Sequence, residues 1–322
     1  MRSTVIGSYP RVGSEIGDGL RREINKENPD QMRIRQLEKR LTGEVVYEMV
    51  SAGIDLPNCG FVDVHDELTW PLQYVHGVEF GGMAKIFHTN THYRKAIVNG
   101  EIQMDGSFVS GLYATASEVH PQVKLELPGP YTMAKHSVLA GGPYKNTKEL
   151  AYAYARLYGE LLQGKNVPFV QFNEPSIIAY RRQHDDIGIV PSLYEMMLDG
   201  LNVPVAVWTY YGTYSAEALN MLFSLPVSAV GIDFVWDPDA AGLIRKISPD
   251  KGIGFGVVDS GDRGQLKTED PDEVARTVRD LSGYVDFGRS FLSSNATLEH
   301  VARDYARRKL AVISEATRRV NE

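Results

Sequence analysis

One stretch of the chain, residues 165–178, restricts the possible fold more than any other. Its apolar run Val167–Phe172 has the length and composition of a buried strand, and it ends abruptly at the triplet Asn173-Glu174-Pro175. Pro175 has no N–H for a strand ladder and favours an extended conformation at the residue before it. Because parallel α/β barrels place polar side chains where their strands end, we expect Asn173 and Glu174 at such an edge. The simpler interpretation is a polar loop that terminates a core strand.

Short apolar segments of this kind alternate with amphipathic segments along the whole chain. We predict strands at residues 4–6, 61–64, 122–127, 167–172, 203–207, 229–235, 252–258 and 284–292. The main helices are predicted at residues 31–52, 148–162 and 303–320. Strands that alternate with helices indicate an α/β fold with a parallel sheet. Eight such repeats in 322 residues predict a (β/α)8 TIM barrel, with residues 1–322 as a single domain. The extra length, residues 66–121, would form an insertion between strands 2 and 3, with helix or loop at residues 70–82.

The composition excludes several classes of protein. The formal net charge of −7 argues against a nucleic-acid-binding surface and against a polybasic membrane contact, because both need clustered cations. No apolar run reaches the roughly 18 residues of a transmembrane helix, and the first residues lack the apolar stretch of a signal peptide. Cys59 is the only cysteine, which suits the reducing cytoplasm and excludes any zinc site in this chain that needs two thiolates.

Several polar side chains at predicted strand ends are candidates for acid–base chemistry. They are His65 and Glu67 after the second strand, Glu174 after the fourth and Asp233 in the sixth. Carboxylates and imidazoles at the mouth of a barrel can take up and release protons. Polar residues also terminate ordinary strands, and the spacing alone does not favour the catalytic interpretation. The aromatic run at residues 208–211 could likewise stack on a planar ligand or simply pack.

A group of cations lies near the expected junction between the first strand and the first helix. Its members are Arg11, Arg21, Arg22 and Lys26. Guanidinium and ammonium groups pair with carboxylates, so this group could hold a ligand that is rich in carboxylates. A solvated helix face would have the same composition.

Four stretches together resemble the cobalamin-independent methionine synthase family: Gly7–Gly13, Leu20–Ile24, Leu127–Thr132 and Val170–Pro175. Members of that family build two similar barrels from one long chain. The C-terminal barrel holds zinc and homocysteine, the N-terminal barrel is zinc-free, and folate polyglutamate lies between the two. The segment Lys85–Tyr93 is similar to the N-terminal type at nearly every position. The chain therefore resembles the zinc-free N-terminal barrel as a stand-alone chain.

The resemblance also implies that the family's zinc ligands are missing. The zinc-binding barrel has a His-x-Cys at the end of the fifth strand, a Glu on the sixth and a Cys after the eighth. This chain has Trp208-Thr-Tyr210, Asp233 and the run 293–296 at those places. Zinc lowers the pKa of a thiol such as homocysteine, whose thiolate attacks the methyl group. The resemblance implies no metal in this chain and zinc only in a partner subunit.

In the same family, the N-terminal barrel contacts the anionic tail of the folate. The resemblance carries these contacts onto Arg22, Glu23, Asn25 and Lys85, although Lys85 could equally be a surface lysine. The full set of residues expected to bind folate or substrate is Arg11, Arg21, Arg22, Glu23, Asn25, Lys26, Lys85, Asn90 and Asn173. The family has a lysine in place of Asn25, and an aspartate that could hold a substrate ammonium group in place of Asn173.

The resemblance implies a zinc-free barrel subunit of a cobalamin-independent methionine synthase. It would help bind methyl-tetrahydrofolate, or a related pterin, for methyl transfer to homocysteine with a separate zinc-containing methionine synthase barrel as partner. We expect a cytoplasmic location and no nucleic-acid or membrane partner. Two alternatives stay open: an independent enzyme of the same superfamily that acts on an unknown small molecule, and a protein that only binds a reduced pterin.

Overall fold

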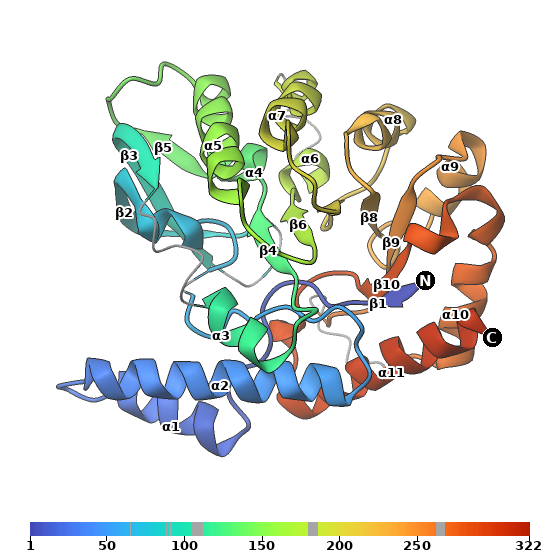
Figure 1. Cartoon of the computed structure of the whole chain (residues 1–322), viewed down its shortest axis with the longest axis horizontal. Coiled ribbons are helices and arrows are strands. Elements are labelled where there is room, and N and C mark those ends of the chain that lie inside the picture. The colour runs from blue at the N-terminus through green and yellow to red at the C-terminus, as the bar shows by residue number, and fades with distance from the viewer. Residues whose placement is uncertain (65, 88, 90–91, 105–111, 180–185, 262–267) are drawn as a thin grey trace.

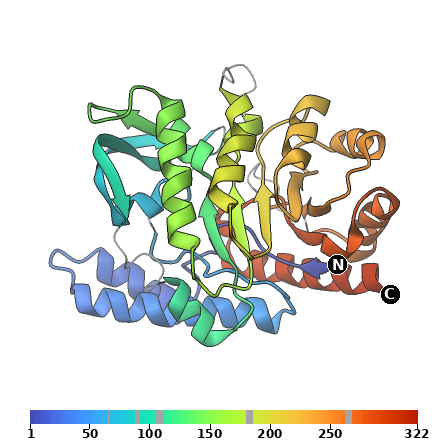
Figure 2. The same ribbon diagram turned by 45° about the horizontal axis from the view of Figure 1, so that its top comes forward.

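A computed structural model describes residues 1–64, 66–87, 89, 92–104, 112–179, 186–261 and 268–322. Parallel strands at its centre curl into one sheet, and helices surround this sheet (Figures 1 and 2). The strand order is β1-β10-β9-β8-β7-β6-β4. The bounds are β1 Arg2–Ser3, β4 Leu125–Pro128, β6 Val170–Asn173, β7 Val205–Trp208, β8 Ala229–Asp233, β9 Gly252–Val258 and β10 Phe291–Ser294. The predicted α/β class with a parallel sheet is confirmed.

The two edges of this sheet, β1 and β4, are bridged by the backbone of residues 56–57. Leu56 N donates to the carbonyl of Ser3 at 3.0 Å, and Lys124 N donates to the carbonyl of Pro57 at 2.9 Å. Thr4 and Leu56 also form an isolated parallel bridge. The described sheet therefore has seven strands, and the predicted ring of eight strands is not among the elements assigned in the described residues.

The predicted second strand at residues 61–64 is wrong. Residues 61–63 form a turn, and Gly60 and Phe61 have φ angles of 73° and 51°, which lie outside the strand region. Phe61, Val62 and Val64 are buried in the main core. Their apolar character therefore reflects burial, which a turn can share with a strand.

A second, three-stranded sheet lies between residues 57 and 140. β2 (Val75–Lys85) pairs antiparallel with β3 (His92–Met104), and β5 (Ser137–Leu139) pairs with β3 in parallel. The prediction of helix or loop at residues 70–82 is wrong from residue 75 onward, since only Trp70–Tyr74 forms a short 3-10 helix. Two register shifts interrupt the pairing of β2 with β3, and they disrupt the alternation that would reveal a strand.

Two of the three longest described helices begin at side chains that satisfy their first N–H groups. Asp30 accepts hydrogen bonds from Met32 N and Arg33 N at the start of α2, and Asn146 accepts one from Glu149 N at the start of α5. The helices predicted at residues 31–52, 148–162 and 303–320 correspond to α2 (Gln31–Ser51), α5 (Thr147–Leu162) and α11 (Arg303–Asn321). The others are α1 Glu15–Ile24, α3 Leu112–Val119, α4 Pro130–Lys135, α6 Ser176–Ala179, α7 Val190–Leu198, α8 Ala216–Ser224, α9 Ala240–Ile247 and α10 Pro271–Arg279. Among the described helices, none has the length and apolar character needed to cross a bilayer.

Large side chains fill the inside of the curled sheet. Trp208, at the end of β7, lies against glycines of two neighbouring strands. A Cβ atom at Gly231 or at Gly254 would come within 2.1 Å of the Trp208 ring, so these positions need glycine. Phe169 and Phe291 belong to the same buried cluster, with ring centroids 5.1 Å apart. The interior is thus a packed core, as in parallel barrels, and the carboxyl ends of the strands are the place to look for a ligand site.

Candidate functional site

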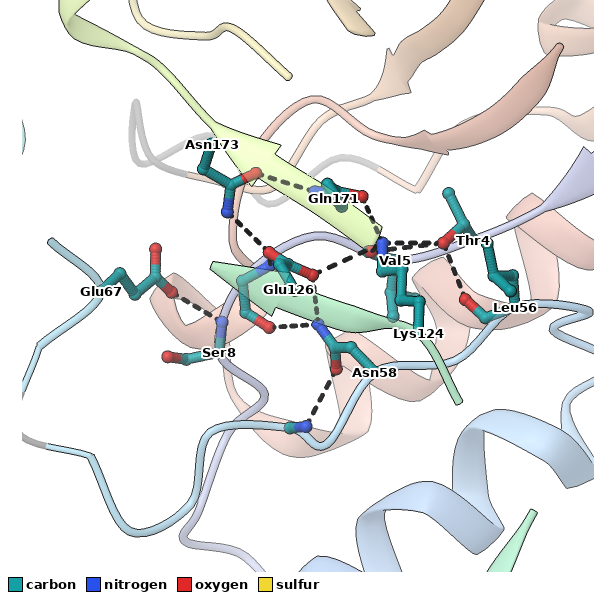
Figure 3. A network of polar contacts seen from close by, with 12 residues as sticks. Thr4, Val5, Ser8, Leu56, Asn58, Glu67, Lys124, Glu126, Gln171 and Asn173 are labelled. Carbon is teal, nitrogen blue, oxygen red and sulfur yellow. Dashed lines mark hydrogen bonds and ion pairs between the residues drawn. The ribbon is translucent and has the colours of Figure 1, made fainter. Parts of the chain in front are cut away.

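A buried polar network lies directly under the carboxyl ends of β4 and β6 (Figure 3). Lys124 and Glu126 are two residues apart, as are Gln171 and Asn173 on the neighbouring strand, and side chains two apart on a strand share one face. Lys124 Nζ donates to Gln171 Oε1 at 2.5 Å and to Thr4 Oγ1 at 2.9 Å, and it lies 3.4 Å from a carboxylate oxygen of Glu126. Burial lowers the pKa of Lys124, and the nearby Glu126 opposes this shift.

Glu126 connects this network to the loop that follows β1. One of its oxygens accepts from Gly7 N at 2.7 Å and from Asn173 Nδ2 at 2.7 Å, and the other accepts from Asn58 Nδ2 at 2.9 Å. Gly7 has a φ of 66°, and a Cβ atom there would lie 2.6 Å from Glu67 Oε1. Glycine is therefore required on both conformational and steric grounds. The next N–H, of Ser8, donates to Glu67 Oε1 at 2.6 Å.

Glu67 lines a small cavity at the carboxyl ends of the strands, which we call the mouth cavity. Its volume is about 110 Å³, and its lining residues are Asp66, Glu67, Leu68, Ile86, Phe87, His92, Tyr210, Tyr211, Thr297 and Glu299. Burial, and to a smaller extent the nearby Glu299, raise the pKa of Glu67 to about 7, while hydrogen bonds from Thr297 and Ser8 oppose the shift. A carboxyl group with a pKa near neutrality can act as a general acid or base.

A second cavity, which we call the α1 cavity, adjoins the first. Its volume is about 330 Å³, and it is lined by Pro10, Arg11, Val12, Gly17, Leu20, Arg21, Ile24, Asn25, Glu299 and Val301. Glu299 lines both cavities, and Arg11 forms an ion pair with it at 3.1 Å. Three residues predicted to bind folate or substrate, Arg11, Arg21 and Asn25, are therefore brought together by the fold.

The other predicted tail contacts lie outside both linings. Glu23 turns inward, where it accepts from Lys26 Nζ at 2.6 Å and from Asp30 N at 3.2 Å, so it ties the end of α1 to the start of α2. Arg22 is exposed on α1, and Lys85 is exposed at the end of β2. His65 and Asn90 lie outside the described residues.

Glu174 and Asp233, two of the acid–base candidates, are hydrogen-bonded to backbone N–H groups. Glu174 is fully buried and accepts from Tyr131 N at 3.0 Å and Thr132 N at 2.7 Å, at the start of α4. Burial raises its pKa to about 7 although these hydrogen bonds favour the charged form. Asp233 accepts from Trp236 N at 2.8 Å and from Tyr211 N at 3.2 Å. Neither residue lines the two cavities, so of the described candidates Glu67 alone does.

Reasoning from the sequence missed Glu299 and most of the buried network. The signal for the network was available: Lys124 and Glu126 alternate with apolar residues in a strand that is buried on both faces. A lysine and a glutamate two residues apart in such a strand must pair with each other or with other buried groups. Glu299 lies in the short 3-10 helix Leu298–His300 after β10, and its contact with Arg11 depends on a fold that brings the two ends of the chain together.

The residues at the family's zinc positions do not fit a zinc ion. Trp208 fills the interior of the sheet, and Tyr210 supplies a phenol at the mouth cavity. Cys59 is buried, and burial raises the pKa of its thiol to about 12, which disfavours the thiolate that zinc binds. In the part of the chain that the structure describes, no three His, Cys, Asp or Glu side chains are grouped to hold a metal.

Solved structures and curated sequences share this architecture. The chain superposes on a B12-independent methionine synthase from Shewanella sp. W3-18-1, solved in complex with selenomethionine, with a TM-score of 0.79 at 19% identity over 99% of this chain and 97% of that one. A putative vitamin-B12-independent methionine synthase from Listeria monocytogenes gives 0.76 at 15% identity over 99% and 97%. These likenesses show a shared fold.

The sequence relatives have nearly the same length as this chain. A methionine synthase of Saccharolobus solfataricus is 26% identical over 99% of this chain and 95% of that protein, and one of Sulfurisphaera tokodaii is 25% identical over 99% and 92%. The sequence model of the family described as "Cobalamin-independent synthase, N-terminal domain" matches residues 77–283. The chain therefore belongs to the cobalamin-independent methionine synthase family, through the N-terminal domain of that family.

Proposed function

We propose that this chain serves the methyl-transfer step of methionine synthesis by binding the anionic tail of methyl-tetrahydrofolate, or of a related reduced pterin, in the α1 cavity. The observation that carries the proposal is the grouping of Arg11, Arg21 and Asn25 around one cavity beside the mouth of the sheet. Guanidinium groups bind glutamyl carboxylates through charge-assisted hydrogen bonds. Arg11 is already paired with Glu299, so the exposed Arg21 is expected to supply most of the attraction for the tail.

The proposal extends to a partner. Homocysteine attacks a methyl group as a thiolate, and a zinc ion stabilises the thiolate by lowering the thiol pKa. Because the described residues do not fit zinc, we propose that a separate zinc-containing methionine synthase barrel activates homocysteine in the cytoplasm. This chain would then act as a single-domain, zinc-free subunit that presents the pterin.

A second candidate is supported by the length of the relatives. The chain spans 95% of the Saccharolobus solfataricus methionine synthase, so a protein of this size carries that name without a second barrel. In this alternative the chain is an independent enzyme, and Glu67 is the described acid–base candidate that faces a cavity.

Binding of the tail can be tested by calorimetry with methyl-tetrahydrofolate that carries either one or three glutamates. We expect the triglutamate to bind about tenfold more tightly, since one additional charge-assisted contact contributes roughly 1.5 kcal/mol. Arg21→Ala should remove most of this difference. Arg245→Ala, an exposed arginine on α9, is the matched control and should leave it unchanged. Equal affinity for the two ligands, or a full preference for the triglutamate in Arg21→Ala, would contradict the proposal.

Methyl transfer distinguishes the two candidates. Methionine formation from homocysteine and methyl-tetrahydrofolate triglutamate is measured with this chain alone, with a one-barrel zinc-containing methionine synthase alone, and with both. The subunit proposal predicts that turnover rises at least about tenfold in the mixture, which corresponds to a decrease of about 1.4 kcal/mol in the activation free energy. Turnover by this chain alone supports the independent enzyme, and an unchanged rate in the mixture rules out the partnership.

A further inference from the structure

The mouth cavity and the α1 cavity differ in the charge of the groups that line them. Glu67, Asp66 and Glu299 contribute carboxylates to the mouth cavity, and His92 is the one basic side chain in its described lining. Both oxygens of Asp66 accept hydrogen bonds from Thr69, and one also accepts from Arg94 N, so Asp66 is used to hold its own loop. Glu67, which accepts from Ser8 N through one oxygen, and Glu299, which is paired with Arg11, are the carboxylates that remain beside the space.

Aromatic rings form another part of the lining of the mouth cavity. Tyr210 and Tyr211 contact each other edge to face with ring centroids 4.8 Å apart, and Phe87 lies 5.9 Å from Tyr211. All three side chains are buried, at 2–6% exposure. Because neighbouring aromatic rings contact one another here, they make a continuous wall that lines the same space as Glu67.

The backbone of this wall is strained. Phe87 has a φ of 44° and Tyr211 a φ of 66°, in the left-handed region that bulky residues rarely adopt. Such a conformation costs of order 1–3 kcal/mol and persists where the surroundings enforce it, commonly at functional sites. Asp233 holds one of them, since its carboxylate accepts from Tyr211 N at 3.2 Å. The fold thus holds two aromatic rings at this cavity in spite of the conformational cost.

We propose that the mouth cavity binds the positively charged head of a small organic cation, of the quaternary ammonium or sulfonium class, between the aromatic wall and the Glu67 carboxylate. Aromatic faces attract such cations through their quadrupoles, and a carboxylate adds direct charge attraction. A cavity of about 150 Å³ admits the six carbons of benzene, and this cavity, with about 110 Å³, leaves room for the roughly four or five heavy atoms of a trimethylated head group. This binding is separate from the tail binding proposed for the α1 cavity.

Other ligand classes fit the mouth cavity less well. An anion would face three carboxylates and a single imidazole. A zwitterionic amino acid would bring a carboxylate of its own, and Arg11, the nearest guanidinium on the adjoining cavity, is paired with Glu299. A metal ion needs several oxygen, nitrogen or sulfur ligands, whereas aromatic carbon occupies much of this wall.

The proposal is tested by calorimetric titration of the whole chain with choline and with dimethylbutanol, which has the same shape but an uncharged carbon in place of the nitrogen. The pH is set above the Glu67 pKa of about 7, so that this side chain is charged. Choline is expected to bind about tenfold more tightly than dimethylbutanol, the size of effect that cation–π and charge attraction give together at a partly desolvated site. Betaine, which adds a carboxylate to the same head, should bind more weakly than choline. The order choline, then betaine, then dimethylbutanol supports the proposal.

Three variants locate the site. Glu67→Gln keeps the shape of the side chain and removes its charge, and it should lower the affinity for choline to nearly that for dimethylbutanol. Tyr210→Leu should weaken choline several-fold, and Tyr210→Phe should not. Glu217→Gln, an exposed carboxylate on α8, is the control. Thermal unfolding of each variant checks that it is folded.

The proposal is overturned if choline and dimethylbutanol bind equally, if neither binds, or if folded Glu67→Gln binds choline as the wild type does. Preferential binding of betaine would also overturn the proposal, because a preference for the betaine carboxylate would require a cationic side chain of the protein beside the head group. Binding of the pterin tail is measured in a separate titration and is expected to depend on Arg21, so either proposal can fail without the other.

Discussion

The two cavities share Glu299, yet they are built in opposite ways. The mouth cavity is acidic and aromatic, and its loop rests on the buried pair Lys124 and Glu126 through Gly7 and Ser8 (Figure 3). The α1 cavity has Arg21 on the exposed face of α1, and Arg11, which precedes that helix and pairs with Glu299. A change under the mouth cavity should therefore act on the stability of the fold, whereas a change at the α1 cavity should act on binding alone.

The largest expected difference concerns Glu126. Glu126→Ala leaves Lys124 as a buried cation without its carboxylate, and it removes the acceptor for Gly7 N and for two asparagine side chains. Removing one member of a buried pair costs about 3–5 kcal/mol in the free energy of unfolding. Arg21→Ala, at the exposed cavity, should cost less than about 0.5 kcal/mol. Urea unfolding measures both variants, and a cost below about 1 kcal/mol for Glu126→Ala would show that the network does not support the mouth.

Next in size is the dependence of stability on pH, which should have opposite signs for Glu67, in the lining of the mouth cavity, and for Glu23, on α1 but outside the lining of the α1 cavity. Burial and Glu299 raise the pKa of Glu67 from 4.5 to about 7, so the folded state binds this proton more strongly. Its contribution to stability is full below pH 4.5 and is lost as the pH rises through about 7. Hydrogen bonds from Lys26 and from Asp30 N lower the pKa of Glu23, so its contribution is present above 4.5 and is lost as the pH falls through its lowered pKa.

The measurement is the melting temperature of the wild type, Glu67→Gln and Glu23→Gln as a function of pH. Glu67→Gln should remove part of the fall in melting temperature between pH 4.5 and about 7. Glu174 and Asp63, whose pKa values burial also raises to about 7, should keep the rest of that fall. Glu23→Gln should change the profile only on the acid side. A Glu67→Gln profile that coincides with the wild type between these limits would mean that Glu67 is not desolvated.

The smallest expected effect is a difference in salt dependence. Exposed charges are screened when the Debye length falls, so raising the salt from about 50 to about 300 mM should weaken binding of the triglutamate tail by several-fold. Choline in the partly buried mouth cavity should lose no more than about twofold over the same range. The two titrations are repeated at both salt concentrations. Equal salt dependence would remove the distinction between a buried and an exposed cavity.

The sequence predicts the helices of this chain better than it predicts which segments pair in its sheet. α2, α5 and α11 are amphipathic over many residues, and polar caps mark the start of α2 and α5, so local information is sufficient. The prediction of a second strand at residues 61–64 is wrong because these residues are apolar through burial in a turn. The backbone of residues 56–57, which include Pro57, instead bridges the sheet edges β1 and β4. Pairing between segments far apart in the chain depends on the whole fold.

For the candidate site, the sequence indicates the strand ends but not the direction of each side chain. Asn173 is the last residue of β6 and Glu174 follows it, and alternation turns Asn173 into the buried network and Glu174 toward the start of α4. Asp233 likewise binds backbone N–H groups. Arg11, Arg21 and Asn25 line one cavity. The resemblance carries a folate-tail contact onto Asn25, but composition alone does not bring the three residues together.

The most direct test of the two-cavity account is a crystal structure of the chain with methyl-tetrahydrofolate triglutamate. The account predicts glutamyl carboxylates of the ligand in the α1 cavity, within hydrogen-bond distance of the Arg21 guanidinium, and no ligand carboxylate beside Glu67. A glutamyl tail that enters the mouth cavity between Glu67 and Tyr210, or one that binds elsewhere on the surface, would contradict it.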